Sequence, residues 1–477
     1  MGGELGLRNN VDLRNGLDRR DRFDLRDSAA FVAAHPGAPT AFDGPAMAAV
    51  LSGALGAAVV TCRPDQALFE PDGYCMVRCN VELERGDTLV VGARLFGDAD
   101  VADAFLADAL ERPAADLDDR SHRPPVPVLA ATVPALAMAV SVFPVDGELP
   151  ALVRVTDPDE AAALLDRALG AVPGPYRVAA AHYGRRRRCA VRYEGGEPRS
   201  AVVAYGKVAN DGGGRDTRAV TDALRVAGAD FDVPQVLADR PDLGLIVLGR
   251  IAGAPRVAHA LRARVRGTEA PPDAPPLEEA VATCGRIAAA LHRVEVPLAE
   301  RRTLDGELAV LRDSIDVVGR YTPELAARLN PAMVSVESGA ADTPAAADVT
   351  AHGDFSYTQL LFSRDRRGLV DFDGVCRAEP ALDLGCFLAY LRFATVKAAG
   401  ADAPRFAPLE DELEAVFLRA YGAAGGPSDP SDASVRDRIR VYETVSLLQL
   451  AVHAWQKVKP VRLGRILTVL DARASAM

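Results

Sequence analysis

Two carboxylates and an amide follow one another closely late in the chain. Asp354 lies in a short loop, Gln359 follows five residues later, and Asp371 comes after an apolar stretch. One carboxylate that accepts a proton from a hydroxyl, with an amide and a second carboxylate that hold Mg²⁺ against nucleotide phosphates, is the set of groups that phosphoryl transfer needs. We therefore expect Asp354 to be the base, and Gln359 and Asp371 to be metal ligands.

A hairpin has to bring these groups together. Residues 359–362 read as a strand, residues 363–368 as a polar turn, and a second apolar strand then leads to Asp371. A hairpin of this kind returns the second acid towards Asp354. His-Gly-Asp is a common turn and Asp-Phe-Asp a common strand end, so the spacing between the two is what makes the pair informative.

The loop resembles a known family. It departs from the protein-kinase pattern H-R-D-x-x-x-x-N in having Gly353 for Arg and Gln359 for Asn. This form is similar to the aminoglycoside phosphotransferase and choline kinase superfamily, in a branch with an extra N-terminal lobe and the loop HGDFxxxQ. Residues 377–385 match the family's next segment. The resemblance implies that Asp383 accepts backbone N–H groups of the catalytic loop and that His352 supports the metal-binding strand.

The same resemblance assigns nucleotide-binding positions. Lys207 ends an apolar strand and would reach the ATP phosphates, although a lysine at a strand end is also unremarkable. Asp222 is the only carboxylate on the helix expected over 217–227, and it would replace the usual glutamate partner of this lysine. The backbone of Leu248 and Arg250 would form the hinge that binds adenine. No glycine-rich motif precedes Lys207. Four arginines at 185–188 stand in that turn, either as a phosphate cover or as a solvated strand.

An internal repeat extends through the first half of the chain. Residues 126–136 align with residues 233–243 at an offset of 107 without a gap, and Arg94 is the counterpart of Lys207. Both copies show the order strand, turn, strand, helix and strand pair. We therefore expect an α+β, bilobal protein-kinase-like fold with an antiparallel N-lobe sheet and a mainly helical C-lobe, preceded by a degenerate N-lobe-like repeat.

Domain boundaries follow from this repeat. The expected parts are a disordered tail over 1–40, a degenerate N-lobe-like domain over 45–165, a kinase-like N-lobe over 170–255, and a helical catalytic C-lobe over 256–477. Within the C-lobe, apolar residues recur at three- and four-residue spacing over 277–293, which predicts a helix.

Composition narrows the class of partner. The chain has 477 residues and a formal net charge of −11, which argues against nucleic acid as a partner. No run of eighteen apolar residues and no signal peptide occurs, so we expect a cytoplasmic protein without a membrane partner. The seven cysteines show no zinc-site spacing and are expected to be buried thiols.

The expected function is transfer of the γ-phosphoryl group of ATP, with Mg²⁺, to a hydroxyl of a small metabolite such as a sugar, an aminoglycoside or an amino alcohol. A sugar kinase of the maltokinase type, a kinase of a peptidyl Ser or Thr, and a pseudokinase that binds nucleotide or a partner without catalysis remain open. The first lobe could cap the site, form a homodimer contact or bind a partner enzyme. The acids at 410–414 are either an acceptor pocket or a solvated helix face. No G-x-S-x-G elbow or histidine cluster supports a hydrolase.

Overall fold

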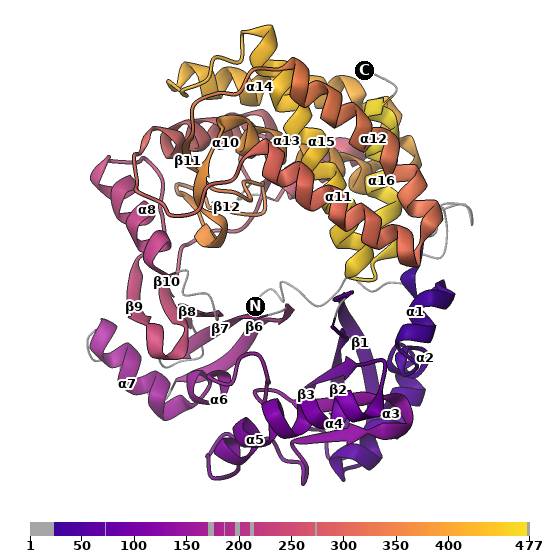
Figure 1. Cartoon of the computed structure of the whole chain (residues 1–477). Coiled ribbons are helices and arrows are strands. Elements are labelled where there is room, and N and C mark those ends of the chain that lie inside the picture. Colours follow the sequence, from indigo (N-terminus) through magenta and orange to yellow (C-terminus); the bar gives the residue numbers. More distant parts are fainter. Residues whose placement is uncertain are drawn as a thin grey trace. The chain divides into compact units, whose positions relative to one another are not determined.

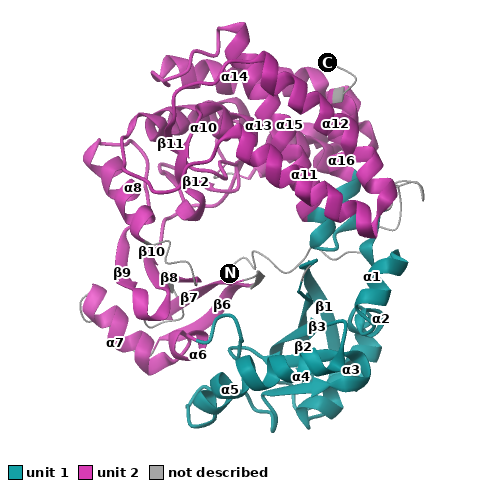
Figure 2. Cartoon of the chain, viewed as in Figure 1, with its two compact units in different colours: residues 1–150, 454–464 teal, residues 151–453, 465–477 magenta. Residues whose placement is uncertain are grey.

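The chain forms two compact units. The computed structural model describes residues 23–71, 73–169, 176–185, 187–195, 201–209, 214–271 and 274–474. The first unit is drawn from residues 1–150 and 454–464, and the second from residues 151–453 and 465–477. Figure 2 distinguishes the two by colour.

The first unit is built on a five-stranded antiparallel sheet of order β1-β2-β3-β5-β4. Its strands are β1 (Val59–Phe69), β2 (Cys75–Leu83), β3 (Thr88–Leu95), β4 (Ala130–Val133) and β5 (Met138–Val142). Alternate residues of β2 from Cys75 to Leu83 are buried, whereas Arg78 and Asn80 between them are only half-buried. A period of two is what a strand with one apolar face requires. Its helical segments are α3 (Gly44–Leu55), α4 (Ala99–Phe105), η3 (Leu106–Leu110), α5 (Glu111–Asp118) and η4 (Pro134–Leu136).

The tail expected over 1–40 can be compared with the structure only from residue 23 onwards. Residues 1–22 of that tail lie outside the described residues. Beyond them, η2 (Leu25–Asp27), α1 (Ala29–Ala34) and α2 (Ala38–Ala41) are formed. Leu25 and Phe31 are fully buried, and the Ser28 side chain caps α1 by accepting a hydrogen bond from the backbone N–H of Phe31. The expectation of a disordered 1–40 was wrong for this stretch because two apolar side chains suffice to anchor the short helices.

The second unit begins with a sheet of the same order, β6-β7-β8-β10-β9, also antiparallel throughout. Its strands are β6 (Arg177–Arg185), β7 (Arg188–Gly195), β8 (Ala201–Ala209), β9 (Val236–Arg240) and β10 (Leu245–Gly249). The turns η4 and η5 (Pro241–Leu243) are followed by Ala137 and Gly244, which both have left-handed backbone. These two residues are 107 positions apart, the offset found in the sequence.

The boundary between the units lies at residue 150, not near 165. Helices α6 (Leu152–Val155) and α7 (Pro158–Leu169) belong with the second sheet. The buried Tyr193 hydroxyl of β7 donates a hydrogen bond to the Val155 carbonyl oxygen at 3.4 Å. Helix α8 (Gly214–Val226) completes this lobe between β8 and β9 (Figure 1).

The rest of the second unit is mainly helical. Its helical segments are α9 (Val257–Arg266), α10 (Leu277–Arg293), α11 (Leu304–Tyr321), α12 (Pro323–Asp342), η6 (Phe372–Gly374), α13 (Pro380–Ala399), η7 (Gly400–Phe406), α14 (Ala407–Ala423), α15 (Ala433–Gln456) and α16 (Pro460–Ala474). The helix expected over 277–293 is confirmed as α10. Helix α13 has sixteen buried residues among its twenty and forms the centre of this region. Helices α15 and α16 are joined through residues 454–464, which cluster with the first unit.

Two short antiparallel pairs lie among these helices: β11 (Val349–Ala351) with β14 (Cys376–Ala378), and β12 (Leu360–Phe362) with β13 (Arg367–Leu369). The β12–β13 hairpin confirms the predicted strand, turn and strand. Backbone bridges join this hairpin to the N-lobe, from Asp232 to Gly368 and from Ala254 to Phe362. Gly253 has a φ of +118°, and a Cβ there would lie 2.9 Å from the Phe362 backbone. Only glycine permits this close approach.

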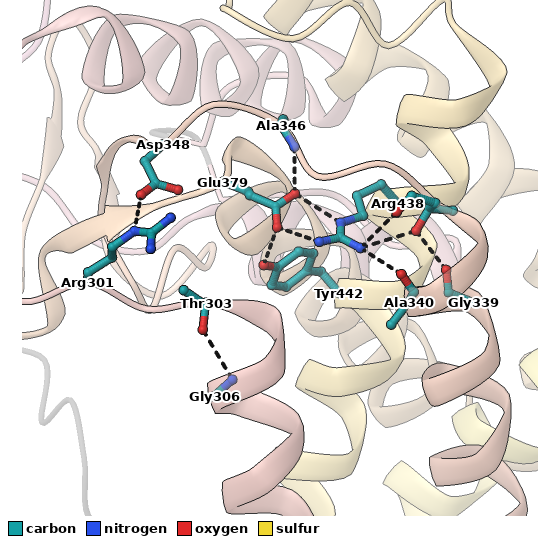
Figure 3. A network of polar contacts seen from close by, with 11 residues as sticks. Arg301, Thr303, Gly306, Gly339, Ala340, Ala346, Asp348, Glu379, Arg438 and Tyr442 are labelled. Carbon is teal, nitrogen blue, oxygen red and sulfur yellow. Dashed lines mark hydrogen bonds and ion pairs between the residues drawn. The ribbon is translucent and has the colours of Figure 1, made fainter.

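A buried ion pair fixes the start of α13. Glu379 accepts hydrogen bonds from Arg438 at 2.9 and 2.6 Å, from the Tyr442 hydroxyl at 3.1 Å and from the Ala346 backbone N–H at 3.0 Å (Figure 3). Arg438 also donates to carbonyl oxygens at the end of α12. The network joins α12, α13 and α15, and every oxygen of the carboxylate is used, as a buried charge requires.

All seven cysteines are free and buried, as the sequence predicted. Among the described residues, no helix combines the length and the apolar character needed to cross a membrane.

We predict that Phe69→Ala will shift the fluorescence of the first unit. Trp455 is the only tryptophan of the chain, is 1 % exposed, and meets the Phe69 ring edge-on at a centroid distance of 5.6 Å. Truncating a buried phenylalanine costs about 3–5 kcal/mol and opens space beside the indole. The emission maximum should move to longer wavelength and the urea midpoint should fall. Val60→Ala is the control, because Val60 is 60 % exposed on the same strand. An unchanged emission maximum and midpoint in Phe69→Ala would contradict this packing.

Candidate active site

Asp383 holds the loop between β11 and β12 through hydrogen bonds to the backbone of that loop. This carboxylate of α13 is fully buried and accepts the backbone N–H groups of His352 and Gly353 at 2.6 and 2.9 Å. The Nε2 atom of His352 lies 3.0 Å from the Val370 carbonyl oxygen and donates a hydrogen bond to it. Val370 directly precedes Asp371. Asp383 therefore contacts the loop at the two residues that precede Asp354.

Asp383 has a third partner that sequence reasoning missed. His292 at the end of α10 is buried, and its Nε2 donates to Asp383 at 3.1 Å while its Nδ1 lies 3.0 Å from the Tyr421 hydroxyl of α14. Burial alone would raise the pKa of Asp383, but its hydrogen bonds with His292 and the His352 backbone outweigh burial and hold that pKa below its ordinary value. The carboxylate therefore stays ionised at neutral pH and keeps its hold on the loop.

Gly353 is required by packing. Its φ is +79°, and a Cβ there would lie 2.0 Å from the Gly374 carbonyl oxygen. No side chain fits between the two segments, so the loop passes directly against the turn that follows Asp371.

Asp354 and Gln359 are neighbours at the surface of this loop. Asp354 is exposed, and the Gln359 side-chain nitrogen lies 3.5 Å from its Oδ2. The Gln359 backbone carbonyl accepts from the Val370 N–H at 3.0 Å. The amide thus comes from the start of the same hairpin that carries Asp371 at its end.

Asp371 meets Lys207 of β8. The ammonium lies 2.5 Å from Asp371 and 2.6 Å from Asp373, so it bridges two carboxylates. Burial alone would lower the pKa of Lys207, but the charges of Asp371 and Asp373 outweigh burial and raise it. Asp371 itself has left-handed backbone, with φ 70°. Such backbone is uncommon in residues other than glycine and recurs at functional sites. Asp373 was not singled out in the sequence, although it is the second acid of Asp-Phe-Asp.

The predicted partner of Lys207 on α8 needs correction. Asp222 binds Arg225 of its own helix at 2.6 Å, and its side chain is 57 % exposed. Aspartate is too short to leave the helix surface, and an arginine three residues on offers a nearer partner. Lys207 of β8 is instead paired with Asp371 and Asp373, at and just after the start of η6.

The other residues that the sequence predicts to bind nucleotide lie on the N-lobe. Leu248 is buried in β10, paired with Tyr205 of β8, and the exposed Arg250 follows the strand end. Among the arginines at 185–188, Arg186 lies outside the described residues, and Arg187 and Arg188 are exposed. The structure thus brings together Asp354, Gln359, Asp371, Lys207, His352 and Asp383, and leaves Asp222 outside this group.

The corresponding position in the first unit is closed. Arg94 on β3 pairs with Ala139 of β5, as Lys207 pairs with Ile246 of β10. Its side chain is 1 % exposed, binds Asp146 at 2.9 Å, and lies against the rings of Tyr74 and Phe105. Asp146 belongs to the turn that follows β5. The first sheet therefore fills with its own side chains the place that Lys207 occupies in the second.

The acids at 410–414 divide into two kinds. Glu410 and Glu414 bind Arg392, at 3.3 and 2.5 Å, while Asp411 and Glu412 are exposed. Two of the acids therefore bind an arginine of α13 from α14, and both interpretations of the cluster, an acceptor pocket and a solvated face, stay open.

A family model agrees with this geometry. The model of the phosphotransferase enzyme family matches residues 191–430, which is half of the chain. The chain therefore belongs to the phosphotransferase enzyme family. A search of curated proteins finds no match.

Solved structures with a similar fold include kinases of small molecules. Aminoglycoside phosphotransferase APH(3'')-Id from Streptomyces rimosus is 22 % identical, over 60 % of this chain and 98 % of that one, with a TM-score of 0.37. A choline/ethanolamine kinase family protein from Mesorhizobium loti is 20 % identical, over 67 % and 97 %, with a TM-score of 0.44. A choline kinase from Cryptosporidium parvum is 13 % identical, over 63 % and 89 %, with a TM-score of 0.44. The family match, and not these likenesses, carries the assignment.

We predict that Asp383→Asn will loosen the loop and weaken the second unit. An amide cannot accept both N–H groups and the His292 proton, so buried donors lose their partners at a cost of about 3 kcal/mol. Because the pKa of Asp383 is lowered in the folded state, its stabilisation is present at neutral pH and is lost as the pH falls through that value. Urea unfolding at pH 7 should show the loss, and the difference from wild type should shrink in acid.

Asp313→Asn, an exposed carboxylate on α11, is the matched control for this variant. Equal urea midpoints for Asp383→Asn and wild type at pH 7 would show that the carboxylate does not hold the loop.

Proposed function

We propose that this protein transfers the γ-phosphoryl group of ATP to a hydroxyl of a small metabolite, with Asp354 as the base. The observation that carries the proposal is the ion pair between Lys207 and Asp371. Asp371 follows the β12–β13 hairpin, and the neighbours Asp354 and Gln359 precede the same hairpin. Membership of the phosphotransferase enzyme family supports the reaction class.

The oxygens of this site fit a magnesium ion that is shared with a nucleotide. Asp371 and Asp373 converge on one cation, the Lys207 ammonium, and Gln359 offers an amide carbonyl nearby. Mg²⁺ prefers oxygen ligands and is usually held by one or two carboxylates together with substrate phosphates. Among the described residues, no three His, Cys, Asp or Glu side chains form a group that could hold a metal ion by themselves. When bound, Mg²⁺ would neutralise charge on the phosphates.

The side chains have separate tasks in this proposal. Asp354 accepts the proton of the acceptor hydroxyl as its oxygen approaches the γ-phosphorus, and the bond from that phosphorus to the β-phosphate oxygen breaks to release ADP. In a phosphoryl transfer with such a loose transition state, correct positioning of the reacting groups accounts for most of the rate enhancement. Asp371, Gln359 and Asp373 would hold the metal, and Lys207 would hold phosphate oxygens. The backbone beside Leu248 and Arg250 would receive adenine.

A second candidate, a pseudokinase, rests on one observation. Asp222 pairs with Arg225 and leaves Lys207 without a carboxylate partner from α8. Lys207 instead contacts the acids expected to bind metal. ADP release from Mg·ATP across a panel of kanamycin, choline and glucose separates the two functions, because a pseudokinase binds the nucleotide without releasing ADP.

We expect Asp354→Asn to abolish turnover while leaving Mg·ATP affinity nearly intact, since the residue contacts the acceptor and not the nucleotide. Loss of a positioned general base lowers rates by about 10²–10⁴-fold. ADP release in the acceptor panel measures the first effect and calorimetry the second. Full turnover in this variant would exclude Asp354 as the base.

Asp371→Ala should remove the Mg²⁺ dependence of nucleotide binding, because it deletes the carboxylate expected to join the metal to the phosphates. Calorimetric titration of ATP with Mg²⁺ and with EDTA tests this. Asp365→Ala is the control, because Asp365 lies exposed in the turn of the same hairpin. Unchanged ATP affinity with Mg²⁺ in Asp371→Ala would count against the whole proposal.

A further inference from the structure

The catalytic loop has a second support on the side opposite Asp383. The loop before α11 brings Glu300, Arg301 and Arg302 alongside β14, where the Arg302 N–H donates to the Arg377 carbonyl at 2.9 Å. From this position the Arg302 Nη1 donates to the Gly353 carbonyl oxygen at 2.8 Å. Gly353 directly precedes Asp354, so the peptide between them receives a charged donor.

Arg302 is itself held in one orientation. Its Nε and Nη2 donate to the two oxygens of Glu307 on α11, both at 2.8 Å, and the Gln449 side chain of α15 donates to the same carboxylate at 2.5 Å. A bidentate pair of this kind fixes the plane of the guanidinium. The Arg302 side chain is 22 % exposed and that of Glu307 is 11 % exposed. The third nitrogen is therefore aimed at the Gly353 carbonyl by geometry that the helices set.

Charge reinforces the arrangement. Burial alone would raise the pKa of Glu307, but its hydrogen bonds and charge interaction with Arg302 outweigh burial and lower it. Both partners are thus ionised at neutral pH, and the pair persists over the range in which the loop has to work.

The Gly353 residue is consequently clamped from two sides. Its N–H is bound by Asp383 and its C=O by Arg302, while the missing Cβ leaves room for Gly374. These two bonds hold the consecutive peptide units on either side of the Gly353 Cα, so both limit rotation about its backbone and with it the direction in which Asp354 leaves.

We propose that Arg302, oriented by Glu307 and Gln449, is a positioning residue that sets the orientation of Asp354 through the Gly353 carbonyl. This inference rests on the proposed role of Asp354. It assigns to α11 and α15 a direct part in aligning the base, although these helices lie far from it in the sequence.

Two variants separate positioning from simple loss of charge. Arg302→Lys keeps a cation for Glu307, but a single ammonium cannot replace a planar fork that serves the carboxylate and the carbonyl together. The double variant Arg302→Gln with Glu307→Gln removes both charges and so leaves no buried ion unpaired, which protects folding. Arg301→Lys is the matched control. Arg301 is the adjacent residue, is 64 % exposed and binds Asp348, which precedes β11 (Figure 3).

Amide hydrogen exchange of the full chain, followed in peptides that cover residues 349–359, reads the clamp without any need for activity. We expect exchange in this segment to rise about tenfold or more in both Arg302 variants and to match wild type in Arg301→Lys, since one charged hydrogen bond accounts for about 1.5–3 kcal/mol and 1.4 kcal/mol is tenfold. Unchanged exchange in both Arg302 variants would overturn the inference.

ADP release from Mg·ATP, with water, kanamycin, choline and glucose as acceptors, gives the kinetic readout. The rate should fall about tenfold or more in both Arg302 variants, while the calorimetric Kd for Mg·ATP stays within about twofold, because Arg302 touches no group expected to bind nucleotide. A wild-type rate in Arg302→Lys would also overturn the inference. If wild type itself neither binds Mg·ATP nor releases ADP, the proposed function fails, whereas the exchange result still decides whether Arg302 holds the loop.

Discussion

The second unit depends on one buried carboxylate. Asp383 is taken out of water on α13, and an ionised group in that position is tolerated only if its oxygens are fully used. Its hydrogen-bond donors are two N–H groups of the β11–β12 loop and the imidazole of His292. The loop must therefore keep its conformation if the buried charge is to keep its partners. Helix α10, helix α13 and the loop cannot separate without stranding that charge.

The same logic recurs around the centre of the helical region. Glu379 and Arg438 are buried together where α12, α13 and α15 meet, and Arg392 is buried with Glu443. Buried ion pairs add little net stability compared with well-packed apolar residues, but breaking one by removing a partner costs about 3–5 kcal/mol. They therefore favour one arrangement of the helices over its alternatives. Apolar packing supplies the stability of α13, and the charged pairs determine which residues face one another.

The sequence predicts those elements whose pattern is local, but it does not predict contacts between distant parts of the chain. The β12–β13 hairpin and α10 could be predicted because strand and helix periods are local, and the loop contacts of Asp383 follow the pattern of the family. The partner of Lys207 could not, because Asp371 and Asp373 are more than 160 residues away and reach it only through the tertiary fold. The position of Asp222 on a helix predicts a pair with Lys207, but the nearby Arg225 competes for the same carboxylate. Arg302, Glu307 and Gln449 carry no motif at all. Their role depends on three elements meeting, which no local pattern encodes.

The closed position of the first unit has an evolutionary consequence. Arg94 and Asp146 have side chains that are 1 % and 4 % exposed, so replacing either one alone removes the counter-charge of a buried group. Substitutions at these two positions are therefore expected to be epistatic, since the cost of changing one residue depends on which residue occupies the other position. Tyr74 and Phe105, whose rings lie against the guanidinium, add two more positions to the same dependency. We therefore expect coupled changes at these positions to cost less stability than single ones, whereas exposed residues of the same sheet carry no such dependency.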